Sequence, residues 1–267
     1  MNKIIFSLLF TSFFNGLKHT QKLFNSSKTN IETTEKEQIP KNVEKLIKYY
    51  SSISYYKENY LYFKDGSKQI YDDRQHKNES ELINSPDIED MFKYEYNQWQ
   101  GNKMPQNFDP GRIRNEEFFK KIYGTSKQHV QNKLIVVNWC PKLASQKIQI
   151  TSINKINEKV DSISKEIDCH PDLKKYIQKI GGTFNWRKIN GTNRLSMHSF
   201  GMTIDVNVNY SNYWQWDAKS TNENIKLNFR NKIPLKLVKI FEKYGFIWGG
   251  NWYHYDTMHF EYRPELL

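Results

Sequence analysis

The sequence has only two cysteines, no internal repeat, and no apolar run of membrane-spanning length after its first residues. Cys140 and Cys169 allow at most one disulfide, and the sequence leaves open whether they pair or stay as two thiols. No stretch after residue 17 reaches the roughly 20 apolar residues that a spanning helix needs. These absences exclude a heavily cross-linked scaffold and a chain that crosses a membrane repeatedly. At 267 residues the chain is long enough to bury a sizeable core.

The first 17 residues have the composition of an export signal. Residues 4–14 form an almost unbroken apolar run behind Lys3, with the length of the apolar part of a signal peptide. The small-residue cleavage pattern is poor, so the sequence leaves open both cleavage and retention as a membrane anchor through residues 4–14. We expect an exported protein of the periplasm or cell envelope.

The formal net charge of +11 favours anionic partners such as nucleic acid, phospholipid or acidic cell-wall polymers. A drift in nucleotide composition would give the same excess of lysine, so the charge does not choose among them. A nucleic-acid binder needs a basic stripe interleaved with aromatic residues, whereas the lysines here are scattered. We therefore expect no nucleic-acid partner.

Apolar spacing and turn residues predict an α+β fold. The expected fold has a small antiparallel sheet with flanking helices that carries the candidate site, plus an N-terminal α/β accessory region. We predict a signal peptide or anchor at residues 1–17, a polar linker at 18–41, the accessory region at 42–130, and the site-bearing domain at 131–267. Helices are expected over residues 43–56, 115–123, 160–167, 171–180 and 234–244, with a further helix start at 85–87. Strands are expected over residues 59–63, 67–71, 134–139, 148–153, 202–209, 246–248 and 258–262.

Two segments far apart in the sequence hold the residue types of a catalytic zinc site. His198, Asp205 and His259 offer two imidazoles and a carboxylate, which would leave a fourth position open for water. Asp256 lies three residues before His259, where it would accept and return the proton of that water. Alternation along 202–209 and 258–262 places Asp205 and His259 on polar strand faces. His254 as a ligand, and Glu261 in place of either carboxylate, stay open as alternatives.

The same residues carry a family resemblance. The run from Ser196 through His198 and Gly201 to Asp205, followed by residues 256–261, resembles the VanY-like zinc peptidases of the D-alanyl-D-alanine carboxypeptidase family. Relatives of that family include L-alanyl-D-glutamate peptidases. The resemblance extends from about residue 181 to 264, and residues 1 to about 100 carry none.

The resemblance implies a role for each matching residue. His198, Asp205 and His259 become the ligands of Zn2+, and Asp256 becomes the catalytic carboxylate. An upstream arginine polarises the scissile carbonyl in relatives, which implies Arg187 or, as the alternative, Arg194. The supporting or substrate-contacting residues would be Ser196, Glu261, Arg194 and Trp248.

The expected activity is that of a monomeric zinc metallopeptidase which hydrolyses the peptide stem of bacterial peptidoglycan. A D,D-carboxypeptidase and an L-alanyl-D-glutamate endopeptidase both fit the sequence. The alternative is a non-catalytic, metal-containing cell-wall binding module of the same fold. Asp256 argues against that alternative, because a pure binder needs no carboxylate at this spacing.

Overall fold

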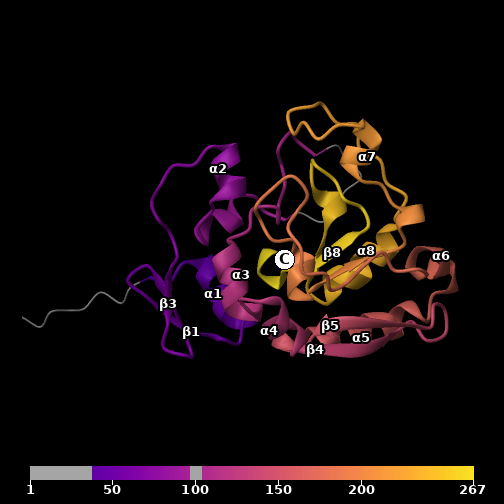
Figure 1. Cartoon of the computed structure of the whole chain (residues 1–267), viewed down its shortest axis with the longest axis horizontal. Coiled ribbons are helices and arrows are strands. Elements are labelled where there is room, and N and C mark those ends of the chain that lie inside the picture. Colours follow the sequence, from indigo (N-terminus) through magenta and orange to yellow (C-terminus); the bar gives the residue numbers. More distant parts are fainter. Residues whose placement is uncertain (1–37, 97–103) are drawn as a thin grey trace, which may run out of the picture. The chain divides into compact units, whose positions relative to one another are not determined.

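The computed structural model describes residues 38–96 and 104–267, which lie within one unit from Glu37 to Leu267 (Figure 1). The export signal predicted for residues 1–17 and most of the linker predicted for 18–41 fall outside the described residues. Within them, no helix combines the length and apolarity required to cross a bilayer. The described residues contain helices and three small antiparallel sheets, which confirms the α+β class.

The first sheet follows a short helix near the start of the described residues. The elements are α1 (Lys41–Tyr49), β1 (Ile53–Lys57), β2 (Tyr60–Phe63) and β3 (Lys68–Ile70). The turn at Asp65 and Gly66 joins β2 to β3, as predicted. The helix predicted over residues 43–56 was too long, because Ile53 and Tyr56 pair across to β2. β-branched and aromatic side chains favour this strand once a partner strand is present.

Three helices and a single turn connect this sheet to the second one. They are α2 (Glu79–Asn84), a 3-10 turn (Glu89–Phe92), α3 (Glu116–Tyr123) and α4 (Lys127–Gln131). The prediction for α3 is confirmed at both ends. The Asn115 side chain accepts a hydrogen bond from the Phe118 amide, and the helix stops at Gly124, whose φ is 137°. The helix start predicted at residues 85–87 is the 3-10 turn.

The second sheet is a two-stranded hairpin covered by one helix. β4 (Leu134–Trp139) pairs antiparallel with β5 (Gln146–Thr151), and α5 (Ile156–Ile167) packs against both strands. The helix predicted over residues 171–180 is shorter, with a 3-10 turn before α6 (Lys174–Ile177). It stops because Gln178 is extended (ψ 147°), three residues before Gly181.

The third sheet holds both segments of the candidate site. Its elements are β6 (Thr203–Asp205), α7 (Trp214–Ala218), α8 (Leu235–Lys243), β7 (Phe246–Trp248) and β8 (His259–Tyr262), and the strand order is β6-β8-β7. The strand predicted over residues 202–209 ends at Asp205. Beyond it the Asn207 side chain accepts a hydrogen bond from the Asn209 amide, which favours a turn over a continued strand.

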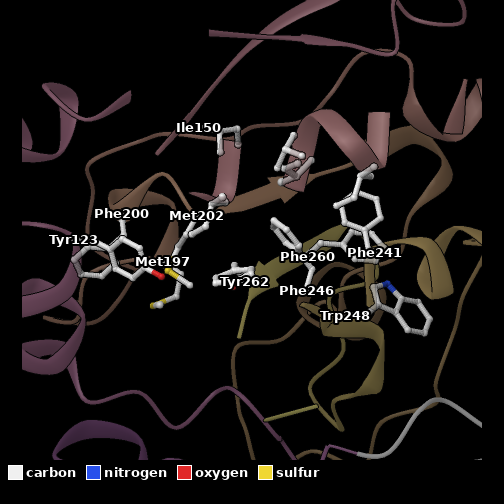
Figure 2. Close-up of a cluster of buried hydrophobic side chains, with 14 of the residues drawn as sticks. Tyr123, Ile150, Met197, Phe200, Met202, Phe241, Phe246, Trp248, Phe260 and Tyr262 are labelled. Atoms are coloured by element: carbon white, nitrogen blue, oxygen red, sulfur yellow. The ribbon is translucent and has the colours of Figure 1, made fainter. Parts of the chain in front are cut away.

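Aromatic side chains fill the core between the third sheet and its helices (Figure 2). Phe241 of α8 stacks on Phe260 of β8 with ring centroids 4.0 Å apart. The same cluster includes Phe118 and Phe119 of α3. Both ranges predicted as separate domains therefore contribute to one core. The boundary between residues 130 and 131 stays a prediction.

Candidate metal centre

His198 and Asp205 are brought together by a tight turn between them. A 3-10 turn (Met197–Phe200) carries His198 and begins at Ser196, whose hydroxyl accepts a hydrogen bond from the His198 amide. Gly201 follows with φ 66°, where a β-carbon would lie 2.6 Å from a Leu134 methyl carbon. Only glycine fits here without displacing its neighbour, so the turn depends on this residue.

His259 reaches the same point from β8. Antiparallel pairing places His259 directly opposite Asp205 in the register of β6 and β8. Asp205 Oδ2 lies 3.1 Å from His198 Nε2, and Asp205 Oδ1 lies 2.9 Å from His259 Nδ1. One donor atom from each of the three residues lies within 4.8 Å of the others. The structure thus assembles the predicted trio from two segments more than fifty residues apart in the sequence.

The other nitrogen of each imidazole is already occupied. His198 Nδ1 lies 2.7 Å from the Thr183 carbonyl oxygen, and His259 Nε2 lies 3.0 Å from Glu261 Oε2. Each of these acceptors takes an N–H, so a neutral ring keeps its lone pair on the nitrogen that faces Asp205. Two lone pairs and a carboxylate that converge in this way suit a divalent metal such as Zn2+.

The charges in this cluster are strongly coupled. Burial alone would raise the pKa of Asp205, but the nearby His198 and His259 hold it well below its usual range. Burial would likewise lower the pKa of His259, yet its hydrogen bonds with Asp205 and Glu261 raise that pKa to about 10. Both shifts come from the attraction between the carboxylates and the imidazole rings, because each stabilises the charged form of the other.

Asp256 lies beside the trio, at the turn that leads into β8. The His259 amide donates to its carbonyl oxygen over 3.2 Å, and its own amide donates to the Gly249 carbonyl over 3.0 Å. A β-carbon on Gly249 would lie 2.5 Å from the Asp256 carbonyl oxygen, which explains the glycine there. The side-chain Oδ1 is shielded from solvent and has no hydrogen-bond partner among the described residues. Burial, and then the charge of Asp205, raise the Asp256 pKa to about 7.

A buried ion-pair network supports His259 from behind. Glu261 is fully buried and lies 2.6 Å from Arg114 Nη2 and 3.3 Å from Arg263 Nη1. Arg263 also pairs with Glu265, which accepts a hydrogen bond of 2.6 Å from the Tyr50 hydroxyl. Burial would raise the pKa of Glu261, but the charge of Arg114, together with His259 and Arg263, lowers it well below its usual range and keeps this carboxylate ionised.

Sequence reasoning anticipated Glu261 but missed Arg114. The two residues are 147 positions apart, and no spacing rule joins them. Arg114 also lies over the Trp252 ring at 5.5 Å. It comes from the range predicted as an accessory region, so that range contributes directly to the surroundings of the site.

The alternative ligand His254 lies in a different set of contacts. Its Nδ1 is 2.6 Å from Asp109 Oδ2, and its Nε2 is 2.9 Å from the Glu223 carbonyl oxygen. Both ring nitrogens are therefore occupied by protein oxygens, and the described structure gives His254 no place in the trio. Glu261 is occupied by arginines and does not replace Asp205.

The remaining predicted residues occupy different environments. Arg187 is exposed, and one of its nitrogens donates to the Lys188 carbonyl. Arg194 is half-buried beside a cavity. Trp248 is fully buried, and its indole N–H donates to the Thr257 carbonyl over 2.9 Å. Of the two roles expected for Trp248, the supporting one fits this position in the turn before His259, because its ring does not reach the surface.

The structure answers the question that the sequence left open about Cys140 and Cys169, which do not form a disulfide. Both thiols are free, with Cys140 buried and Cys169 exposed. Burial raises the pKa of Cys140 to about 12, which keeps it as a thiol near neutral pH.

Comparison with known families finds one match. Residues 190–262 match a family model described as D-alanyl-D-alanine carboxypeptidase. This segment contains the three candidate ligands, Asp256 and Glu261. Neither the curated proteins nor the solved structures give a match to the chain. The predicted resemblance is thus supported at the level of the family over this segment, without a choice of subfamily.

Proposed function

We propose that this protein is a zinc-dependent peptidase that hydrolyses the peptide stem of bacterial peptidoglycan. One observation carries the proposal: one nitrogen of His198 and one of His259 face the two oxygens of Asp205, and Asp256, which is close enough for the charge of Asp205 to raise its pKa, has an unpaired carboxylate oxygen among the described residues. These four residues all lie in the segment that matches the carboxypeptidase family model.

The donor set fits the metal that this family resemblance implies. His198, Asp205 and His259 would hold Zn2+, and the ion when bound would supply a Lewis acid and a water of lowered pKa. Thr183 and Glu261 fix the orientation of the two rings through the nitrogens that face away from Asp205. That preorganisation keeps both lone pairs directed at one point.

Asp256 is the proposed proton carrier. Its Oδ1 has no protein partner among the described residues, so it is available to accept a proton from an attacking water. Its raised pKa of about 7 matches a group that takes up and returns a proton near neutral pH. After bond cleavage it would deliver that proton to the leaving amine.

Arg187 is the proposed stabiliser of the developing oxyanion. Burial, and then the charge of Asp256, raise the pKa of Tyr213 to about 12, while the charge of Arg187 lowers it. Tyr213 also forms a backbone bridge with Asp256. Asp256 and Arg187 thus both influence Tyr213, and the exposed Arg187 guanidinium would stabilise the charge that develops on a substrate carbonyl.

The peptidoglycan stem is proposed as the substrate because the family match and the apolar leader both favour the cell envelope, and the charge of +11 is compatible with an anionic wall polymer. A non-catalytic metal-containing wall binder is the competing function. It requires no free proton acceptor, whereas Asp256 Oδ1 is buried and unpaired.

Digestion of purified sacculi tests the proposal. The zinc-loaded protein should release altered muropeptides, and their masses would identify the bond that is cut. Asp256→Asn keeps the shape of the side chain but removes the proton acceptor. We expect it to retain zinc and to lose turnover by roughly 10²–10⁴-fold. The matched control is Asp172→Asn at an exposed ion pair with Lys236, which should digest normally.

Two results would contradict the proposal. Unchanged muropeptides with the zinc-loaded wild-type protein would reject the peptidase and favour the wall binder. Near wild-type digestion by Asp256→Asn would remove this carboxylate from the mechanism.

A further inference from the structure

Two neighbouring cross-strand pairs lie on one face of the third sheet. Asp205 of β6 is opposite His259 of β8 in the register of these strands. Two residues along each strand, Thr203 is opposite Glu261. Side chains two residues apart on a strand point to the same face, so the two pairs form adjacent rows. The first row supplies two proposed metal ligands, and Glu261 in the second row supports one of them.

Thr203, the other member of the second row, contacts the remaining imidazole. Its Oγ1 lies 2.9 Å from His198 Nδ1, and its hydroxyl donates to the Thr183 carbonyl oxygen over 3.3 Å. Thr203 is fully buried, so bulk water does not compete for these contacts. The second row therefore places one polar side chain against each histidine of the candidate metal centre.

The Thr183 carbonyl oxygen decides how the hydroxyl and the ring interact. This oxygen lies 2.7 Å from His198 Nδ1 and can only accept hydrogen bonds, so Nδ1 carries the proton. The same oxygen accepts from the Thr203 hydroxyl, which leaves the lone pairs of Oγ1 available to the Nδ1–H. The Nδ1–H is then shared between two oxygens, and Nε2 keeps its lone pair toward Asp205.

The Thr203 hydroxyl also anchors the Thr183 carbonyl, which lies outside the helices and strands. A loop carbonyl has more freedom than a residue in a paired strand. The hydrogen bond from Thr203 ties this oxygen to β6, whose pairing with β8 fixes its position. The main acceptor of the His198 ring is thus held to the sheet that carries Asp205 and His259.

We propose that Thr203 is a positioning residue that orients His198 for metal binding, as Glu261 does for His259. The inference rests on the metal centre of the proposed function and adds a residue outside its ligand set. The two supports differ in charge, because a hydroxyl is neutral and a carboxylate is not. Charge-assisted hydrogen bonds are the stronger kind, so loss of the Thr203 hydroxyl should weaken zinc binding less than loss of Glu261.

The zinc affinity of Thr203 variants tests this role without dependence on turnover. Thr203→Val keeps the shape of the side chain and removes the hydroxyl. We expect its zinc affinity to fall by roughly 10-fold in competition with a chromophoric chelator. Thr203→Ser keeps the hydroxyl and should bind zinc as the wild type does. Thr151→Val is the matched control, because Thr151 is equally buried but its hydroxyl accepts from the Ile153 amide.

Thermal unfolding separates positioning from a general loss of structure. In Thr203→Val the Thr183 carbonyl keeps its hydrogen bond from His198, so no buried polar group loses its last partner. The Tm of the metal-free variant should therefore stay close to that of the wild type. Saturating zinc should raise the Tm of Thr203→Val less than that of the wild type.

Equal zinc affinity of Thr203→Val and the wild type would overturn the inference. A loss of affinity that Thr203→Ser shares would assign the effect to packing rather than to the hydroxyl, and a similar loss in Thr151→Val would make it a general effect of buried threonines. Either result also overturns the inference.

The positioning role and the peptidase fail in different ways. If sacculi are digested but Thr203→Val holds zinc as tightly as the wild type, the positioning role is wrong and the peptidase stands. If zinc affinity depends on the Thr203 hydroxyl but no muropeptide changes, the peptidase is wrong and the positioning role stands. A wild-type protein that binds no zinc would overturn both.

Discussion

Two clusters of acidic and metal-ligating side chains in this protein differ in what neutralises them. In the first, Lys77 Nζ lies 2.8 Å from Asp73, 3.1 Å from Asp87 and 2.7 Å from Asp90. In the second, Asp205 faces two imidazole nitrogens. Carboxylates of this region also have the spacing of a metal site, in the sets Asp72, Asp73, Asp87 and Asp87, Glu89, Asp90, but the Lys77 ammonium already contacts members of both sets. The second cluster has no lysine or arginine on its ligand atoms among the described residues.

The comparison shows that spacing alone does not identify a metal site. Carboxylates held a few ångströms apart need a positive charge between them, and a buried lysine supplies it as well as a metal ion does. The second cluster differs because it contains two histidines. Their orientation directs a nitrogen lone pair of each ring toward Asp205, where a metal cation would bind. We therefore propose metal binding for the second cluster and a stabilising role for the first.

Removal of His198 should have the largest effect on the difference between the two clusters, because it should abolish zinc binding by the second one. His198→Ala takes away one of three proposed ligands, so we expect the purified variant to contain no zinc. Lys77→Met should keep one zinc per chain, because its cluster lies outside the proposed site. Elemental analysis of both proteins after dialysis gives the answer. Stoichiometric zinc in His198→Ala would refute the ligand assignment.

Lys77→Met should instead act on stability. The Lys77 side chain is 7% exposed, and its loss leaves three close carboxylates without their cation. We expect the free energy of unfolding to fall by about 3–5 kcal/mol. Urea unfolding followed by fluorescence measures it, and added calcium should restore part of the loss. The control Lys165→Met removes an exposed ion pair with Asp161 and should cost less than about 1 kcal/mol. Equal stability of the two variants would show that Lys77 is not what holds its cluster together.

A structural feature of this protein could be predicted from the sequence when the residues that determine it are close together in the chain. The ends of α3 were predictable because the capping asparagine Asn115 and the stop at Gly124 act on adjacent backbone. Placement of His259 opposite Asp205 was predictable in kind, since alternation fixes which strand face each occupies. The helix predicted over residues 43–56 was too long. Apolar spacing within this segment does not show that Ile53 pairs with a strand that follows it in the sequence.

The ion pair between Glu261 and Arg114 had no local signal at all. It joins residues 147 positions apart, and it forms only because the segment before α3 lies against β8. Burial then decides its importance, since Glu261 is fully buried and has no bulk water as an alternative partner. A sequence shows which residues can ionise, whereas the fold determines which of them meet.

Arg114→Gln should have the smallest effect of the three variants. It weakens the support of His259 in the second cluster without removing a proposed zinc ligand. Glu261 would lose its contact at 2.6 Å and keep only Arg263 at 3.3 Å, so it would hold the His259 ring less firmly. We expect zinc affinity to fall by roughly 10–100-fold, as for other residues that orient a metal-binding histidine. Competition with a chromophoric chelator measures this directly, with no dependence on turnover. Lys236→Gln removes an exposed cation paired with Asp172 and serves as the matched control. If both variants hold zinc as tightly as the wild type, Glu261 positions His259 without help from Arg114, and the segment before α3 has no part in the metal centre.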